Sequence, residues 1–180
     1  MTQFDPPSRF AEEWIQKFSA QIAEPRRALD VAMGRGRHAL LLAACGLHAY
    51  GVDITFDAVS DARTLAKRRG LDLRAWCADL TVFPLPSRFF DLIVVTRYLQ
   101  RSLCPALMEA LAPGGFLIYE TFTELQRSRG LGPRSPDHLL KAGELRSLFG
   151  SMEAVFYEEV TDPDEDALAR LAARKRSSPS

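Results

Sequence analysis

One short stretch near the amino terminus constrains the fold more than any other part of the chain. Residues 27–38 read Arg-Ala-Leu-Asp-Val-Ala-Met-Gly-Arg-Gly-Arg-His, which predicts a buried parallel strand at 28–31 and a turn containing Gly34 and Gly36. The apolar segment 38–45 then predicts a helix. Glycines let the backbone approach a ligand closely, and a helix N-terminus presents free N–H donors. A strand, a glycine turn and a helix in this order are typical of a nucleotide-binding α/β domain.

A second strand and an acidic residue follow at the spacing that such a domain uses. Residues 48–52 are expected to form a strand that ends in Asp53, about 20 residues after Gly34. A carboxylate at this position can accept hydrogen bonds from two neighbouring ribose hydroxyls. The alternative is that Asp53 caps the next helix, but Thr55 is better placed to do so. We therefore expect Asp53 to bind a ribose.

Composition and charge exclude several classes of partner. Lys and Arg together number 23, as do Asp and Glu, so the 180 residues give no electrostatic case for binding nucleic acid or an anionic membrane. No apolar run approaches the length of a membrane span, and the N-terminus lacks a signal-peptide core.

The three cysteines, Cys45, Cys77 and Cys104, are too widely spaced for a disulfide framework or a zinc site, and each is expected to be buried. We expect a cytoplasmic protein without a bound metal.

The first two thirds of the chain alternate between helices and strands. An amphipathic helix is predicted over 10–22, either packed on the sheet or acting as a lid, after a frayed segment 1–8. Further helices are expected over 56–69 and from Pro105 to the Pro-Gly-Gly turn at 113–115. Apolar segments predict strands at the following positions: 73–77, 90–95 and 116–119. Pro84 and Pro86 make 81–89 a loop.

The last third of the chain contains one conflict. Residues 124–138 are expected to form a long polar loop, followed by a helix that ends at Phe149 and a strand over 152–160. The composition of 167–175 favours a helix, whereas a strand there would complete the sheet. Residues 177–180 are expected to be disordered. No linker divides the sequence, so 1–180 is expected to form one domain.

The ordered motifs resemble those of the class I S-adenosylmethionine-dependent methyltransferases. Asp30, Ala32, Gly34 and Gly36 match the first motif of that family, and the Leu-x-Pro-Gly-Gly turn is common across it. Gly-Arg-Gly-Arg-His and Tyr-Glu-Thr-Phe are similar to the small bacterial, tellurite-resistance-type subgroup, although Met33 replaces a cysteine often found there. The resemblance implies a three-layer, Rossmann-like α/β fold whose mostly parallel sheet has about seven strands and an antiparallel C-terminal strand. We therefore expect 167–175 to be a strand.

The resemblance also implies S-adenosyl-L-methionine as the methyl donor and S-adenosyl-L-homocysteine as the product. Asp30 and the backbone of 32–36 would serve the amino-acid end of the donor, Asp53 the ribose, and Asp79 the adenine amino group. Leu80 would add an apolar wall. The residues expected to bind the cofactor are Asp30, Ala32, Gly34, Gly36, Asp53, Ile54, Asp79, Leu80 and Thr96.

Acceptor-side residues are expected after the fourth and fifth parallel strands, because ligands lie beyond the carboxyl ends of such strands. Arg97, Tyr98 and Arg101 follow one strand, and Glu120 follows the other. Structural alternatives are that Arg101 pairs with Glu109, and that Glu120 pairs with Arg97 or Arg134. Arginines in 124–138, including Arg134, would favour an anionic small molecule. A base is needed only if the acceptor must lose a proton.

Two other functions are compatible with the pattern. A NAD(P)-binding oxidoreductase would use the permissive Gly-x-Gly-x-x-Ala pattern, but Asp30 stands where dinucleotide-binding strands carry apolar residues. A non-catalytic accessory protein that binds the donor is the other alternative. We expect a methyltransferase that acts on a small molecule.

Overall fold

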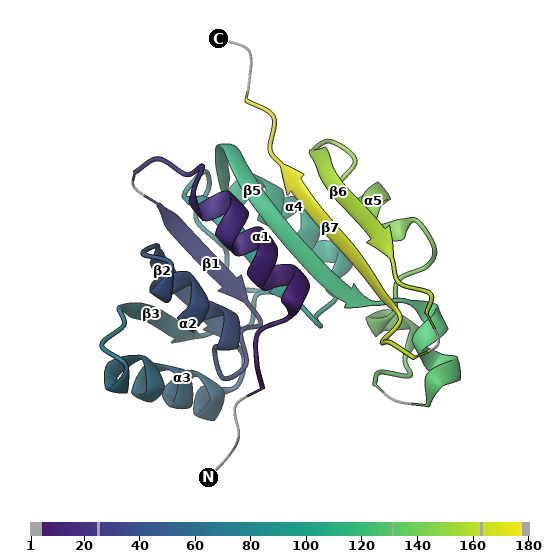
Figure 1. Ribbon diagram of the computed structural model, residues 1–180, viewed down its shortest axis with the longest axis horizontal. Coiled ribbons are helices and arrows are strands. Elements are labelled where there is room, and N and C mark those ends of the chain that lie inside the picture. Colours follow the sequence, from purple (N-terminus) through teal and green to yellow (C-terminus); the bar gives the residue numbers. More distant parts are fainter. Residues whose placement is uncertain (1–4, 25, 131, 163, 178–180) are drawn as a thin grey trace.

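A seven-stranded sheet in the order β3-β2-β1-β4-β5-β7-β6 forms the centre of the molecule (Figure 1). The computed structural model describes residues 5–24, 26–130, 132–162 and 164–177. Its strands are β1 (Arg27–Val31), β2 (His48–Asp53), β3 (Leu73–Cys77), β4 (Phe90–Thr96), β5 (Leu111–Phe122), β6 (Glu153–Glu159) and β7 (Leu168–Arg174). The first five strands pair in parallel, whereas β7 pairs antiparallel with β5 and β6. The predicted Rossmann-like α/β fold is confirmed.

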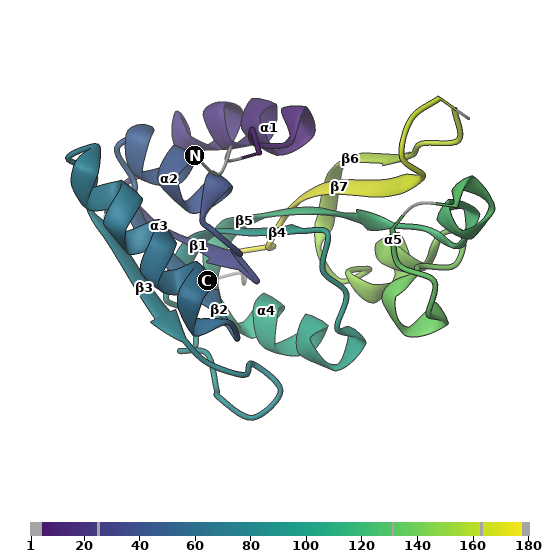
Figure 2. The same cartoon turned by 90° about the horizontal axis from the view of Figure 1, so that it is seen from below.

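Helices cover both faces of the sheet, which makes three layers (Figure 2). On one face lie α1 (Arg9–Ser19), α2 (Arg37–Ala44) and α3 (Phe56–Arg68), and on the other α4 (Cys104–Ala110) and α5 (Glu144–Leu148). Three short 3-10 helices are also described: η1 (Arg101–Leu103), η2 (Glu124–Arg129) and η3 (Pro136–His138). No helix among the described residues combines the length and the apolarity needed to cross a membrane.

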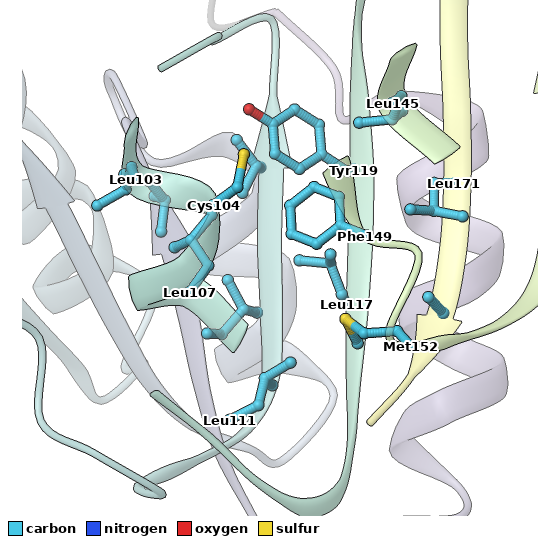
Figure 3. Close-up of a cluster of buried hydrophobic side chains, with 14 of the residues drawn as sticks. Leu103, Cys104, Leu107, Leu111, Leu117, Tyr119, Leu145, Phe149, Met152 and Leu171 are labelled. Carbon is cyan, nitrogen blue, oxygen red and sulfur yellow. The ribbon is translucent and has the colours of Figure 1, made fainter. Parts of the chain in front are cut away.

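The central strands are apolar on both sides because each face contributes to a separate core. In β4, Leu92 and Val94 pack into the core under α1, whereas Ile93 and Val95 pack into the core under α4 and α5. In the second core the rings of Tyr119 and Phe149 are 5.5 Å apart (Figure 3). The Tyr119 hydroxyl donates a hydrogen bond of 3.0 Å to the carbonyl oxygen of Tyr98, so this core also fixes the loop after β4.

The strand β7 decides the conflict at 167–175 in favour of a strand. It lies between β5 and β6, with Leu171 opposite both Tyr119 and Tyr157. Alanine and leucine favour a helix locally, but here both backbone edges of β7 are paired and most of its side chains are buried. Tertiary pairing therefore overrides the local preference.

The amino-terminal segment is more ordered than the sequence suggests. Ser8 is the N-cap of α1, and its hydroxyl accepts a hydrogen bond of 3.3 Å from the Ala11 amide. Pro6 accepts a bond of 3.2 Å from Arg37 through its carbonyl oxygen. The expectation of fraying is therefore wrong for residues 5–8, whereas 1–4 lie outside the described residues. The helix itself ends at Ser19, earlier than predicted.

Three other expectations from the sequence need correction. The 124–138 segment is not a uniform loop, because η2 and η3 lie within it. The strand β5 begins at Leu111, ahead of the Pro-Gly-Gly turn, with an irregular register between Phe90 and Leu92 of β4. Of the cysteines, Cys104 is buried, Cys45 is half-buried and Cys77 is exposed. The predicted disorder of 177–180 falls almost wholly outside the described residues.

Candidate functional site

The glycine turn between β1 and α2 has a backbone that ordinary side chains rarely adopt. Ala32, Gly34 and Gly36 all have positive φ angles, of 52°, 54° and 82°. A Cβ atom at Gly36 would lie only 2.8 Å from the Cβ atom of Ala62 on α3. Glycine at position 36 therefore allows both the turn and the close packing of two helices.

Asp53 joins the end of β2 to this turn. Its Oδ2 atom accepts a hydrogen bond of 2.7 Å from the Gly34 amide, and its Oδ1 atom accepts one of 2.9 Å from the Thr55 amide. Thr55 is the N-cap of α3 as expected, but its side chain makes no capping hydrogen bond. Each carboxylate oxygen has a second lone pair, so Asp53 retains acceptor capacity for a ligand.

An apolar cavity of about 360 Å³ opens beside Asp53, beyond the carboxyl ends of the strands. It is lined by Ala32, Val52, Asp53, Ile54, Ala78, Asp79, Leu80, Thr81 and Tyr98. Six residues predicted from the sequence thus line one cavity. The Thr81 hydroxyl and amide hydrogen-bond Asp79 and lower the pKa of its carboxyl, which keeps it an acceptor at neutral pH.

A second cavity, of about 320 Å³, shares Ala32 with the first and is called the arginine cavity here. Its lining residues are Asp5, Ala32, Met33, Gly34, Arg35, Arg37, Thr96 and Arg97. Arg35 pairs with Asp61 at 3.3 Å, and Arg97 pairs with Asp166 at 3.2 Å. Burial, and then the charge of Arg97, lower the pKa of Arg37. This crowding of cations favours an anionic ligand.

Asp30 is buried behind the glycine turn and lines neither cavity. Its Oδ2 atom accepts a hydrogen bond of 2.9 Å from the Ala39 amide of α2, but its Oδ1 atom has no partner among the described residues. Burial raises the pKa of this carboxyl to about 7. The free Oδ1 atom is compatible with the expected contact of Asp30 with the amino-acid end of the donor, directly or through water.

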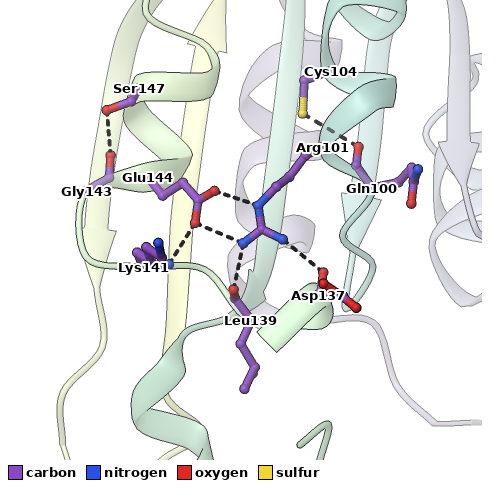
Figure 4. Close-up of polar contacts among 9 residues, drawn as sticks. All are labelled: Gln100, Arg101, Cys104, Asp137, Leu139, Lys141, Gly143, Glu144 and Ser147. Carbon is purple, nitrogen blue, oxygen red and sulfur yellow. Dashed lines mark hydrogen bonds and ion pairs between the residues drawn. The ribbon is translucent and has the colours of Figure 1, made fainter. Parts of the chain in front are cut away.

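Three residues predicted on the acceptor side lie outside both cavities: Arg101, Arg134 and Glu120. The Arg101 guanidinium donates to Glu144 at 2.6 and 3.0 Å and to the carbonyl oxygens of Asp137 and Leu139, so it anchors α5 (Figure 4). Glu109, the partner considered as a structural alternative, instead accepts a bond from Ser87. Arg134 is exposed between η2 and η3. The structural alternative in which Arg101 pairs with Glu109 is therefore wrong.

Glu120 is also engaged elsewhere. Its carboxylate pairs with Arg170 of β7 at 2.8 Å, and the glutamate is only 2% exposed. The structural alternative in which Glu120 pairs with Arg97 or Arg134 is wrong, although the Arg97 amide donates a bond of 2.8 Å to the Glu120 carbonyl oxygen. The sequence of β7 was compatible with a helix as well as with a strand. It therefore gave no indication that Arg170 would pair with Glu120.

Arg35, Arg37 and His38 were missed as individual site residues, although the motif that contains them was recognised. Arg35 and Arg37 line the arginine cavity, and His38 hydrogen-bonds Thr96, another of its lining residues, at 3.2 Å. The only available signal was the alternation of glycine with basic residues in the turn. The described residues contain no cluster of His, Cys, Asp or Glu suited to a metal ion.

The fold can be compared with those of known proteins. The architecture is that of the Rossmann-like methyltransferases, and comparisons with known proteins agree. Residues 28–115 match the family described as methyltransferase domain. This match covers just under half of the chain, and together with the fold it implies S-adenosyl-L-methionine as cofactor.

Two curated relatives are similar to part of this chain. The demethylmenaquinone methyltransferase of Thermus thermophilus is 33% identical over 105 residues, which are 54% of this chain and 48% of that protein. The protein-L-isoaspartate O-methyltransferase of Stenotrophomonas maltophilia is 36% identical over 94 residues, covering 52% and 41%. The chain thus spans about half the length of these relatives, and their different acceptors do not identify its own.

Solved structures share the fold at low identity. The [4+2]-cyclase SpnF has a TM-score of 0.76 at 20% identity, covering 93% of this chain and 80% of that one. TehB from Haemophilus influenzae has a TM-score of 0.71 at 20% identity, covering 89% and 61%. A SAM-dependent methyltransferase of Methanosarcina mazei has a TM-score of 0.73, also at 20% identity, covering 97% and 100%. These likenesses show the fold alone.

Proposed function

We propose that this protein transfers the methyl group of S-adenosyl-L-methionine to a small, anionic acceptor. The observation that carries this proposal is the junction at Ala32 of two cavities with different chemistry. One cavity is mainly apolar and contains two carboxylates, and the other is lined by three arginines. A nucleoside fits the first kind of surface, and an anion fits the second.

The chain's own residues would hold the donor along this junction. Asp53 would accept from the ribose hydroxyls, Asp79 would accept from the adenine amino group, and Ile54 and Leu80 would pack against the base. Asp30 would serve the ammonium group through its free Oδ1 atom. When bound, the donor supplies a methyl group already activated by its sulfonium charge. The protein then contributes mainly orientation, which can lower a barrier by about 7–11 kcal/mol.

Arg97 and Tyr98 are the best-placed predicted residues for the acceptor side. Arg97 lines the arginine cavity, and Tyr98 lines the apolar cavity. Burial, followed by the charges of Asp79 and Asp53, raises the pKa of Tyr98, so its hydroxyl stays protonated at neutral pH and can donate a hydrogen bond. This favours a binding role for Tyr98 over a role as general base.

Ligand binding tests the donor part of the proposal. We expect calorimetry to show binding of S-adenosyl-L-homocysteine and no comparable binding of NADH, because Asp30 stands where dinucleotide-binding strands carry apolar residues. Binding of NADH without any response to S-adenosyl-L-homocysteine would support an oxidoreductase instead. A screen of small metabolites with radiolabelled donor tests methyl transfer, and donor binding without transfer to any acceptor would favour an accessory protein.

Variants at two arginines test the acceptor part. Once an acceptor is known, Arg97→Ala is expected to weaken its binding about tenfold or more, because Arg97 lines the cavity. Arg134→Ala is expected to have a smaller effect, because Arg134 lies outside the cavity. Unchanged turnover and acceptor affinity in both variants would contradict an arginine-bound anion.

We further propose that the chain belongs to the tellurite-resistance-type subgroup. The Gly-Arg-Gly-Arg-His and Tyr-Glu-Thr-Phe motifs support this, as does the fold shared with TehB. Tellurite therefore belongs in the acceptor screen beside thiols and small carboxylates. We also propose that residues 1–180 form one domain, that the protein is cytoplasmic, and that it has no nucleic-acid or membrane partner.

A further inference from the structure

His38 is buried at the start of α2, and both of its ring nitrogens are engaged. The Ser8 amide donates a hydrogen bond of 3.0 Å to Nε2, and the Thr96 hydroxyl lies 3.2 Å from Nδ1. These partners are 30 and 58 residues away along the chain. His38 is 1% exposed and Thr96 is 8% exposed. One imidazole thus connects the N-cap of α1 with the end of β4.

The chemistry of these partners fixes the direction of each hydrogen bond. Burial, followed by the charges of Arg37 and Arg97, lowers the pKa of His38 to about 3, so the ring is neutral at physiological pH. A backbone amide can only donate, so Nε2 must be the acceptor and the single ring proton must be on Nδ1. That proton is donated to Thr96 Oγ1.

Among the described residues, the contact with His38 is the one hydrogen bond given for Thr96 Oγ1, so the hydroxyl hydrogen of Thr96 is not used within the protein. Its oxygen is occupied as an acceptor by His38, and its side chain lines the arginine cavity. Because the side chain of Thr96 lines the cavity, this hydrogen is available to donate to a ligand oxygen there. The surrounding arginines make a negatively charged oxygen the most favourable partner.

We propose that Thr96 is a preset hydrogen-bond donor for a carboxylate or similar oxyanion in the arginine cavity, and that His38 is the positioning residue that sets this direction. The inference rests on the proposed function, in which this cavity takes an anion and adjoins the donor cavity at Ala32. The oxyanion could be the carboxylate of the donor's amino-acid end or a group of the acceptor. In both cases one chain of hydrogen bonds runs from the Ser8 amide through His38 to Thr96. It begins outside the arginine cavity and ends at its lining.

Binding measurements on variants of Thr96 test the ligand and identify its source. The probes are S-adenosyl-L-homocysteine, 5′-methylthioadenosine, which lacks the amino-acid carboxylate, and sulfate added to the 5′-methylthioadenosine complex. If the donor carboxylate is bound, Thr96→Val should weaken S-adenosyl-L-homocysteine roughly ten- to a hundredfold and leave 5′-methylthioadenosine unchanged. If the acceptor oxyanion is bound, only the sulfate affinity should fall.

Two further variants control for a general effect of burial. Thr96→Ser retains the hydroxyl and should bind like the natural chain. Thr121→Val removes a hydroxyl that is also buried, on the adjacent strand β5 and outside the cavity lining, and should leave all three affinities unchanged. Unchanged affinity for both S-adenosyl-L-homocysteine and sulfate in folded Thr96→Val would overturn the proposal.

The role of His38 is tested by the position of its ring proton. Long-range proton–nitrogen correlation spectra distinguish the tautomers of the chain's three histidines and should show His38 protonated on Nδ1. Ser8→Pro removes the amide hydrogen at a residue whose φ of −59° suits proline, whereas Ser8→Ala retains it and loses only the capping hydroxyl. Ser8→Pro should populate both tautomers, and Ser8→Ala should not.

A natural chain with the proton on Nε2 would overturn the proposal, as would a Ser8→Pro variant whose tautomer is unchanged. The spectra need no bound ligand, so they remain decisive even if the protein binds neither nucleoside. Failure to bind either nucleoside would contradict the proposed function, but it would leave the assignment of the His38 tautomer unaffected. Failure of the two ideas can therefore be distinguished.

Discussion

At the scale of single residues, the candidate site contains charged and polar groups whose states are set by burial. Asp30 and His38 lie on either side of the glycine turn, and burial shifts their pKa values in opposite directions, to about 7 and about 3. Both groups are therefore closer to neutral in the folded chain than in water. Asp30 therefore makes the folded chain less stable as pH rises, whereas His38 makes it less stable as pH falls.

The pH dependence of stability should reveal Asp30. Because its pKa rises from 3.8 to about 7 on folding, its stabilising contribution is complete below pH 4 and is lost as pH rises towards 7. Asp30→Asn should therefore gain stability relative to the natural chain by up to about 1.4 kcal/mol per pH unit across this window. Urea unfolding of both proteins at several pH values measures this difference.

The stability of Asp30→Asn must be compared with that of the natural chain, because His38 changes stability with pH in the opposite direction to Asp30. Its pKa is lowered from 6.5, so its contribution is present above pH 6.5 and is lost as pH falls towards 3. His38 is present in both proteins, and its effect cancels in the comparison. A stability difference that does not change between pH 4 and 7 would contradict the raised pKa of Asp30.

Replacement of Asp53 should affect both the ligand and the turn. Asp53→Ala removes the acceptor for the Gly34 and Thr55 amides, and it is expected to weaken S-adenosyl-L-homocysteine binding by about 1–3 kcal/mol and to lower the melting temperature. Asp57→Ala, at an exposed position in the first turn of α3, is the matched control. Calorimetry would remove Asp53 from the site if the affinity of the folded variant were unchanged.

At the scale of elements, the structure depends on two close approaches between segments. In one of them, α2 and α3 meet at Gly36, and in the other β7 inserts between β5 and β6. Both bring together residues far apart in the sequence, so local propensity could not reveal them. Each makes a measurable prediction.

The approach at Gly36 predicts a destabilisation with two separable parts. Gly36→Ala should lower the free energy of unfolding by about 1–3 kcal/mol, because φ is 82° and the new Cβ atom would lie 2.8 Å from Ala62. Gly46→Ala has a similar φ of 76° with no atom within 4 Å of the new Cβ atom, so it measures the backbone part alone. Equal effects in the two variants would show that helix contact is unimportant.

The insertion of β7 predicts that Glu120 stabilises the sheet. Glu120→Ala should lower the free energy of unfolding by about 1–3 kcal/mol, because Arg170 loses its buried partner and keeps only Glu158. Glu158→Ala, which removes the more exposed partner of Arg170, should cost less than about 1 kcal/mol. A variant of Glu120 with normal stability and no turnover would instead support a role in the reaction.

At the scale of the whole molecule, the sequence predicted the sheet well because its signals were periodic and local. The spacing of Gly34 and Asp53 indicated that the two lie together, since parallel strands bring their carboxyl ends to one edge. The resemblance correctly favoured a strand at 168–174, where composition alone favoured a helix. Partners set by tertiary packing were missed, as with Arg101 and Glu144, 43 residues apart.

The candidate site was predicted less completely than the fold for the same reason. Six residues expected in the site line the apolar cavity, and three more expected residues, Gly34, Thr96 and Arg97, line the arginine cavity. The role of His38 depends on Ser8 and Thr96, which are distant in sequence and carry no shared pattern. Such contacts can be identified only once the chain is folded.

The position of β7 has a consequence for the order of events during synthesis on the ribosome. Arg170 follows Glu120 by 50 residues, so β5 is made well before the strand that pairs with its edge and neutralises its glutamate. At translation rates of about 5–20 residues per second, β5 would have an open edge for several seconds. Nascent chains that stall in this interval should be prone to aggregation and should require chaperones.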